Sequence, residues 1–195
     1  LLVASRPDIR TVIHETTVEG LDIVPANIDL SAAEVQLVNE VAREQALKRV
    51  LRPVLDEYDV ILVDCQPSLG LLTINALTAS HGVIIPLETE FFALRGVALL
   101  VETVERVKDR LNATLEIDGI LATMVDSRTL HSREVLERLE QAFGEQLFDT
   151  RIRRTIKFPD ASVANEPITS YAPSHPGADA YRRLAREVIA RGAVS

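Results

Sequence analysis

Short apolar runs separated by longer amphipathic stretches dominate the pattern along this chain. Residues 60–63, 82–87 and 119–125 are continuous apolar runs rather than alternating ones. Such runs are typical of strands buried on both faces of a parallel sheet. Shorter runs at 20–26 and 147–152 predict two further strands. The strand pattern therefore indicates a sheet that is covered on both sides.

Helical spacing fills the intervals between these runs. Ser31 and Glu34 form an S-x-x-E capping box that predicts a helix start. Apolar positions with approximate helical spacing continue this helix over 35–54, and Pro53 is expected to bend or end it. Further helices are predicted at 71–80, 94–111, 132–143 and 177–191, and 159–176 reads as a surface loop. Alternating strands and helices predict an α/β fold with a mostly parallel sheet and helices on both faces.

Composition limits the class of protein. The 195 residues are 47% apolar and 26% charged, which suits one domain over 1–195 of a soluble globular protein. The single cysteine, Cys65, and the lack of a long apolar stretch favour a cytoplasmic setting without a membrane anchor. The net charge of −8 argues against gross attraction to nucleic acid or an anionic membrane, although a local basic patch is compatible with it.

Asp64 ends the apolar run 60–63 and is the strongest candidate for chemistry. The carboxyl ends of strands in open α/β sheets bind ligands, and a carboxylate there suits Mg²⁺ held through water beside a phosphate. The alternative is that Asp64 only ends a strand and caps the next helix. A glycine-rich loop with a Gly-Lys pair would complete a nucleotide site, but the three lysines follow Leu, Val and Ile. Because the sequence begins with Leu1, we expect a fragment of a longer protein.

Several separated motifs together resemble one family. They are YDVILVDCQPSLGLLTINAL at 58–77, IPLETEFFALRGVALLVETVERV at 85–107 and GILATMVDSRT at 119–129. In this order they resemble the ParA/Soj family of deviant Walker-type ATPases, over about 20–190. The resemblance implies a P-loop NTPase-like fold of the SIMIBI type, here lacking its first β-α-β portion. It also implies a chromosome or plasmid partitioning ATPase that binds ATP and Mg²⁺ and forms a homodimer.

The resemblance also suggests roles for individual residues at the nucleotide site. Asp64 looks like the Walker B aspartate that positions Mg²⁺ through water, and Gln66 and Pro67 look like part of the switch segment. The family usually has proline where this chain has Gln66. Its signature lysines and switch I aspartate match no residue here, so no catalytic residue is assigned and the chain alone is expected to be inactive. By position after strand ends, the candidates for the nucleotide-base pocket are Met124, Asp126, Pro159 and Asp160.

A basic segment suggests DNA binding. Arg128 and Lys157 match positions that resemble the DNA-contacting surface of the family, and Arg153 and Arg154 lie in the same segment as Lys157, RIRRTIK. Clustered cations bind phosphates without reading sequence and give salt-dependent affinity. The alternative is an ordinary solvated charged face. The resemblance further implies a ParB-like centromere-binding partner and a cytoplasmic, nucleoid-associated location.

Two other classes of protein stay open. The first is a non-enzymatic DNA-binding or scaffolding module without a phosphate loop. The second is a MinD-like ATPase that associates with membranes, although the end of the terminal helix, 190–195, lacks the bulky apolar and basic face of a membrane-targeting helix. The four histidines lie far apart, which disfavours a zinc site, and Glu88 and Glu90 read as a solvated loop.

Overall fold

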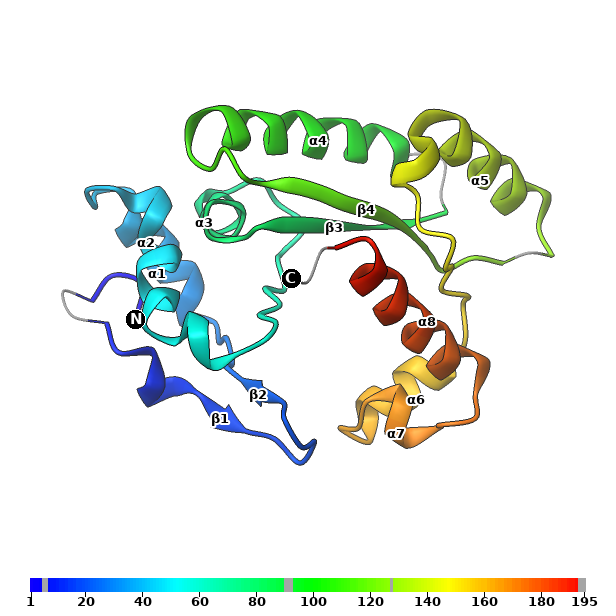
Figure 1. The fold of residues 1–195 in the computed structure, drawn as a ribbon, viewed down its shortest axis with the longest axis horizontal. Coiled ribbons are helices and arrows are strands. Elements are labelled where there is room, and N and C mark those ends of the chain that lie inside the picture. The colour runs from blue at the N-terminus through cyan, green and yellow to red at the C-terminus, as the bar shows by residue number, and fades with distance from the viewer. Residues whose placement is uncertain (5–6, 90–92, 127, 193–195) are drawn as a thin grey trace. The chain divides into compact units, whose positions relative to one another are not determined.

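A computed structural model describes residues 1–4, 7–89, 93–126 and 128–192 of the chain (Figure 1). The chain forms two compact units. The first unit contains Leu1–His81 and Glu105–Leu115, and the second contains Gly82–Val104 and Glu116–Ser195. Each unit is described by itself below.

The second unit contains the parallel sheet. Strand β3 (Gly82–Glu88) pairs in parallel with β4 (Glu116–Thr123), with a register shift between Val83 and Ile84. Both strands were predicted from their apolar runs, and the parallel pairing confirms the α/β class. Their carboxyl ends meet at one edge, where Glu88 lies opposite Thr123. This edge is where the sequence places a ligand site.

The predicted strand at 147–152 is wrong as a regular strand. Only isolated parallel bridges connect this region to β4, at Ile120 with Leu147 and at Val125 with Arg153. The backbone N–H of Phe148 donates to Ile120 O at 2.9 Å, and that of Ile152 donates to Ala122 O at 2.9 Å. The segment therefore runs beside β4 and bonds to it at separated points instead of forming a continuous ladder.

Helices cover both faces of the β3–β4 pair (Figure 1). The amino-terminal part of α4 (Ala93–Arg110) and α5 (Leu130–Phe143) pack on one face, and α8 (Pro176–Ala190) packs on the other. Buried residues of the first face include Ile85, Leu87, Ile120, Ala122, Val97, Val135 and Leu139. The second face joins Leu121 and Ile84 to Ala180, Leu184 and Val188. All three helices were predicted, because each carries an apolar stripe that needs such a sheet face.

Two short helices replace the predicted loop at 159–176. They are α6 (Lys157–Val163) and α7 (Ile168–Tyr171), preceded by the 3-10 turn η4 (Gly144–Gln146). Pro159 lies in the first turn of α6, where a missing N–H costs no helical hydrogen bond. Ala161 and Ile168 form a small buried cluster with Ala178 of α8. Burial of this cluster explains why a proline-rich segment is helical here.

The first unit consists of short elements. The 3-10 turn η1 (Ile9–Val12) precedes an antiparallel ribbon of β1 (His14–Glu15) and β2 (Asp22–Ile23). Helices follow as α1 (Asp29–Leu37), η2 (Arg43–Gln45), α2 (Ala46–Leu51), η3 (Arg52–Glu57) and α3 (Leu71–Ala79). Asn75 is buried and links α3 to α2 and η2. Its side-chain amide accepts a hydrogen bond from Leu47 N and donates one to Arg43 O. This amide therefore fixes the helix that follows the candidate switch segment.

The predicted capping box and long first helix are wrong in detail. Asn27 Oδ1 accepts from Asp29 N at 2.9 Å, so α1 begins before Ser31, which lies inside the helix. Ala42 has a left-handed backbone with φ of 53°, which separates α1 from α2. The predicted effect of Pro53 is confirmed, because α2 ends at Leu51 and the proline lies in η3.

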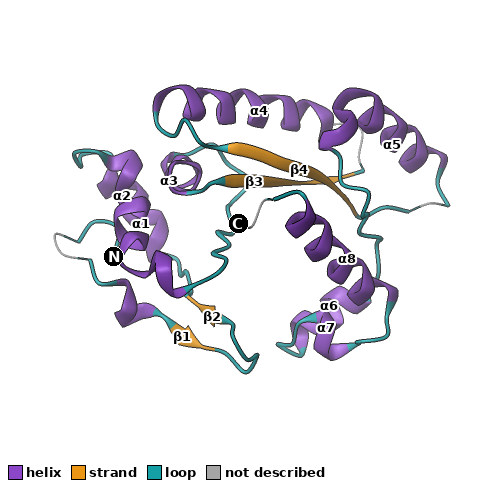
Figure 2. Cartoon of the chain, viewed as in Figure 1, coloured by secondary structure: helices purple, strands orange, loops and turns teal. Residues whose placement is uncertain are grey.

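The apolar run 60–63 has no regular secondary structure and is not a buried strand. None of the described strands pairs with it (Figure 2), and Leu62 is 84% exposed. An apolar run specifies a strand only where a neighbouring strand satisfies its backbone groups and covers its faces. This predicted strand is therefore wrong for the described structure. Among the described helices, none has the length and apolar character needed to cross a membrane.

Candidate functional site

The candidate metal and switch residues lie in the first unit, in the irregular segment between η3 and α3. Asp64, Gln66 and Pro67 are all exposed. The Asp64 carboxylate makes no hydrogen bond or ion pair with the described residues, so it is open to solvent and to a ligand. Cys65 is an exposed residue, but partial burial of its sulfur, and secondarily the Asp64 charge, raise the pKa of the thiol. Cys65 therefore has no sign of an activated thiolate.

The segment is anchored where α3 begins. Thr73 Oγ1 donates to Ser68 O at 2.6 Å, and Glu34 Oε1 of α1 accepts from Leu72 N at 3.3 Å. The Glu34 carboxylate also fills the space that a Cβ at Gly70 would need. Because a carboxylate at a helix N-terminus satisfies a backbone donor, Glu34 fixes the end of the candidate switch segment. The spacing of the sequence did not predict this contact between α1 and α3.

The carboxyl end of β4 carries the candidate base-pocket residues of the second unit. Met124 is 40% exposed and has a left-handed backbone with φ of 52°, which is uncommon for a residue with a side chain. Asp126 lies two residues further on, and its carboxylate accepts hydrogen bonds from Arg128 Nε at 2.9 Å and from Arg128 Nη2 at 2.8 Å. These bonds, helped by the backbone N–H of Arg128, hold the pKa of Asp126 at about 2. The pair is therefore ionised at physiological pH.

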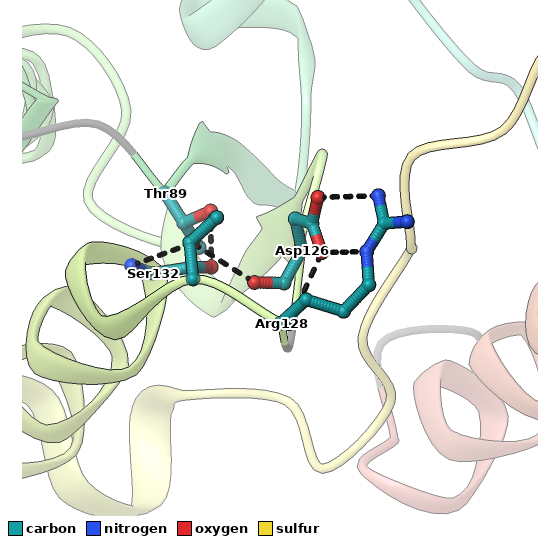
Figure 3. Close-up of polar contacts among 5 residues, drawn as sticks. Thr89, Asp126, Arg128 and Ser132 are labelled. Atoms are coloured by element: carbon teal, nitrogen blue, oxygen red, sulfur yellow. Dashed lines mark hydrogen bonds and ion pairs between the residues drawn. The ribbon is translucent and has the colours of Figure 1, made fainter.

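Two buried hydroxyls lie beside this pair and were not identified from the sequence. Thr89 directly follows β3 and Ser132 lies in the first turn of α5, with their Oγ atoms 3.1 Å apart (Figure 3). Thr129 caps α5, because its Oγ1 accepts from Ser132 N at 3.2 Å. A Thr or Ser just before a helical pattern is a cap signal that locates this start. The contact between Thr89 and Ser132 depends on the fold and has no local signal.

The candidate DNA-binding cations also lie in the second unit. Lys157 Nζ bonds to Asp160 Oδ2 at 3.1 Å and lies 5.8 Å from the centre of the Tyr171 ring. The hydrogen bond to Asp160 raises the pKa of Lys157. Arg153 and Arg154 are exposed. Among the described carboxylates, none lies within ion-pair distance of these two arginines, so the segment presents two cations to solvent.

An open cavity of about 470 Å³ lies at the carboxyl end of β4. Its walls include Thr123, Met124, Ile152, Phe158, Ser162 and Tyr181. Of the four base-pocket candidates, Met124 lines this cavity, whereas Asp126, Pro159 and Asp160 are not among its lining residues. A mostly apolar cavity with a few hydroxyl groups is the kind of site that an aromatic ring enters.

The described residues contain no cluster of three or more His, Cys, Asp or Glu side chains placed to hold a metal ion. A single carboxylate acting through water needs no such cluster, because Mg²⁺ commonly keeps several waters and binds one or two carboxylates together with phosphates. Asp64, an exposed oxygen ligand, fits that arrangement.

Relatives of known sequence establish the family. A family model described as an AAA domain matches residues 1–117. An uncharacterised protein of Mycobacterium tuberculosis is 60% identical over 191 residues, and the chain spans about 60% of the length of this relative. The chromosome-partitioning ATPase Soj of Treponema pallidum is 47% identical over 190 residues, covering 97% of this chain and 75% of Soj.

Solved structures agree with this relationship. A Mycobacterium smegmatis protein named cobyrinic acid a,c-diamide synthase, with bound ATP analogue and magnesium, is 38% identical with a TM-score of 0.77. That match covers 92% of this chain and 66% of the other. The motifs, the parallel α/β sheet and the identity to Soj lead to one conclusion: the chain belongs to the ParA/Soj family of P-loop ATPases.

Proposed function

We propose that the intact protein is a ParA-like partitioning ATPase of a chromosome or plasmid, which binds and hydrolyses ATP with Mg²⁺. The observation that carries this proposal is the 47% identity to a chromosome-partitioning ATPase over nearly the whole chain. The related structure with ATP analogue and magnesium supports the same ligands. The proposed location is the nucleoid in the cytoplasm, and the proposed partner is a ParB-like centromere-binding protein.

Asp64 is the residue that we assign to Mg²⁺, through water. When bound, the ion would neutralise phosphate charge next to the exposed carboxylate. Gln66 and Pro67 follow Asp64 directly, and we assign them to the segment that senses the nucleotide. No Gly-Lys pair occurs in the sequence, so we assign none of its residues to a phosphate loop.

We assign the base of the nucleotide to the carboxyl end of β4. Met124 lines the cavity there. Asp126, Pro159 and Asp160 are proposed as base-pocket residues from their positions in the sequence alone. The apolar wall formed by Ile152 and Phe158 suits the flat face of a base. The hydroxyl groups of Thr123 and Ser162 offer hydrogen bonds to its edge.

We further propose that the intact protein dimerises and binds DNA without sequence preference. The proposed DNA-binding face consists of Arg128, Arg153, Arg154 and Lys157. Cations on an exposed loop and a helix start neutralise phosphates, whereas base readout needs side chains that enter a groove. This local face explains how a chain with a net charge of −8 can bind a polyanion.

The test is DNA binding by an R128A/K157A double variant of the intact protein, measured on two unrelated sequences over a range of salt. We expect affinity to fall about tenfold or more on both sequences, and the log–log salt slope to flatten by about 2. An R49A/R52A variant, which removes two exposed cations outside the proposed face, is the matched control. Unchanged binding would contradict the assignment. Binding to anionic vesicles in place of DNA would favour a MinD-like protein.

The name of the Mycobacterium smegmatis structure suggests a second candidate function, amidation of a cobyrinic acid. We favour partitioning because Soj is more similar, at 47% against 38% identity. Both functions use ATP, so hydrolysis alone does not separate them. Hydrolysis that DNA and a ParB-like protein stimulate would support partitioning, whereas hydrolysis that requires a carboxylic acid substrate and an amine donor would support the synthase.

A further inference from the structure

The four cations of the proposed DNA-binding face fall into two classes. Arg128 is 87% exposed, yet two of its nitrogens bond to the Asp126 carboxylate. Lys157 is also paired with an acid, through a single contact from its Nζ to Asp160 Oδ2 at 3.1 Å. Arg153 and Arg154, by contrast, have no described carboxylate at ion-pair distance. The two cations that match the DNA-contacting positions of the family are therefore the two that carry an acidic partner.

The Asp126 carboxylate is held in its charged form by its pairing with Arg128. The hydrogen bonds from Arg128 keep the Asp126 pKa at about 2, and the nearby charge of Arg154 acts in the same direction. Asp160 lies in the first turn of α6, where its Oδ2 accepts a hydrogen bond from Lys157 Nζ at 3.1 Å. A carboxylate and a phosphate present similar oxygen pairs to a guanidinium, so both compete for the same donors. A DNA phosphate must displace the carboxylate or accept its repulsion.

We propose that the Asp126 and Asp160 carboxylates compete with DNA phosphate for Arg128 and Lys157. This competition lowers the affinity of the proposed DNA-binding face for DNA. The proposal rests on the DNA-binding function proposed above. In this arrangement Arg153 and Arg154 give a constant, weak attraction. Arg128 and Lys157 add to this attraction only when DNA phosphate displaces the Asp126 and Asp160 carboxylates.

The expected size of the effect follows from the exposure of the pairs. Ion pairs at exposed positions are weak, so these acids lower affinity without preventing binding. Removing one such competitor should tighten DNA binding about fivefold at low salt. The gain should shrink as salt rises, because added ions screen exposed charges.

Asp126→Asn is the direct test in the intact protein. Asn keeps the side-chain oxygen that accepts the backbone N–H of Arg128 at 3.1 Å, so the turn is retained while the charge is lost. Glu137→Gln removes an equal charge from an exposed position on α5 and is the matched control. Binding to a short random-sequence duplex is measured for D126N, R128A, D126N/R128A and E137Q.

We expect D126N to tighten binding about fivefold and E137Q to change it less than twofold. In the R128A background, D126N should have no more effect than E137Q, because the competitor no longer has a cation to occupy. D160N should likewise tighten binding in the wild-type background and have no effect in the K157A background. This pair gives a second test if D126N is poorly folded.

Two results would overturn the proposal in different ways. Competition is excluded if R128A weakens binding while D126N has no effect, or has the same effect in the wild-type and R128A backgrounds. In that case the DNA-binding face stands. If R128A and K157A both leave binding unchanged, the face itself fails, and the competition proposal fails with it.

Discussion

Glu187 is the residue through which α8 is tied to the segment that follows η4. Its carboxylate accepts the backbone N–H groups of Asp149 at 2.7 Å and Thr150 at 3.0 Å, and it pairs with Arg191 at 3.0 Å. Arg191 in turn donates to Leu147 O at 2.8 Å. Burial opposes ionisation of Glu187, but the backbone N–H groups of Thr150 and Asp149, the Thr150 side chain and the Arg191 charge together outweigh it and lower its pKa. The ionised form is therefore the one that stabilises the second unit.

Glu187→Gln should lower the free energy of unfolding by about 1–2 kcal/mol at neutral pH, because a charged acceptor of two hydrogen bonds becomes neutral. A lowered pKa in the folded state contributes stability above the ordinary value of 4.5, which is lost as pH falls through the folded value. The gap between wild type and E187Q should therefore close in acid. Urea unfolding at about pH 7 and about pH 3.5 measures it.

Exposed Glu137→Gln is the control and should change stability by less than about 0.5 kcal/mol at either pH. A gap for E187Q that is as large in acid as at neutral pH would show that the carboxylate charge is not what stabilises this contact.

Residues near strand ends were partly predictable. Asp64 and Asp126 were identified because each directly follows an apolar run, and Met124 because it lies near the end of the run 119–125. The contact of Glu34 with the start of α3 was not, because it joins residues 38 apart in the chain. The sequence identifies the acid at Asp126 and the cation at Arg128, but their pairing depends on the conformation of the loop.

At the level of elements, packing requirements decided which predictions succeeded. Strands β3 and β4 and helices α3, α4, α5 and α8 were predicted, because each has an apolar pattern that its neighbours bury. The run 60–63 has the same pattern but no paired neighbour among the described strands. The segment 147–152 bonds to β4 only at isolated points. Propensity alone therefore does not specify a strand without its partner.

Gly119 shows how closely β4 packs against the segment around Phe148. A Cβ at this position would lie 2.6 Å and 2.9 Å from atoms of the Phe148 ring, and Phe148 is 1% exposed. Gly119→Ala should therefore lower stability by about 1–3 kcal/mol, because the ring must move within a closed core. The midpoint and slope of urea unfolding measure this loss.

Gly96 provides the matched control, since it lies in α4 and a Cβ there meets nothing within 4 Å. Gly96→Ala should raise stability by up to about 1 kcal/mol through helix propensity. If G119A is as stable as wild type, the packing of Phe148 against β4 is looser than the structure indicates.

At the level of the whole molecule, the general class of fold was predictable and the division into two compact units was not. Strand and helix alternation specifies α/β, whereas a boundary between units depends on long-range contacts that local patterns do not contain. The family followed from separated motifs, and the 47% identity to Soj bears it out. The proposed chemistry depends on Asp64, which the sequence singles out and the structure leaves exposed.

ATP hydrolysis by the intact protein, with Asp64→Asn as the variant, tests the proposed function most directly. We expect hydrolysis that requires Mg²⁺ and falls about tenfold or more in D64N, because the carboxylate positions the ion beside the phosphates. Asp59→Asn, an equal change at an exposed position just before the same apolar run, should leave the rate within about twofold. Hydrolysis that D64N leaves unchanged, or no hydrolysis by the folded intact protein with Mg²⁺ and DNA present, would contradict a ParA-like ATPase.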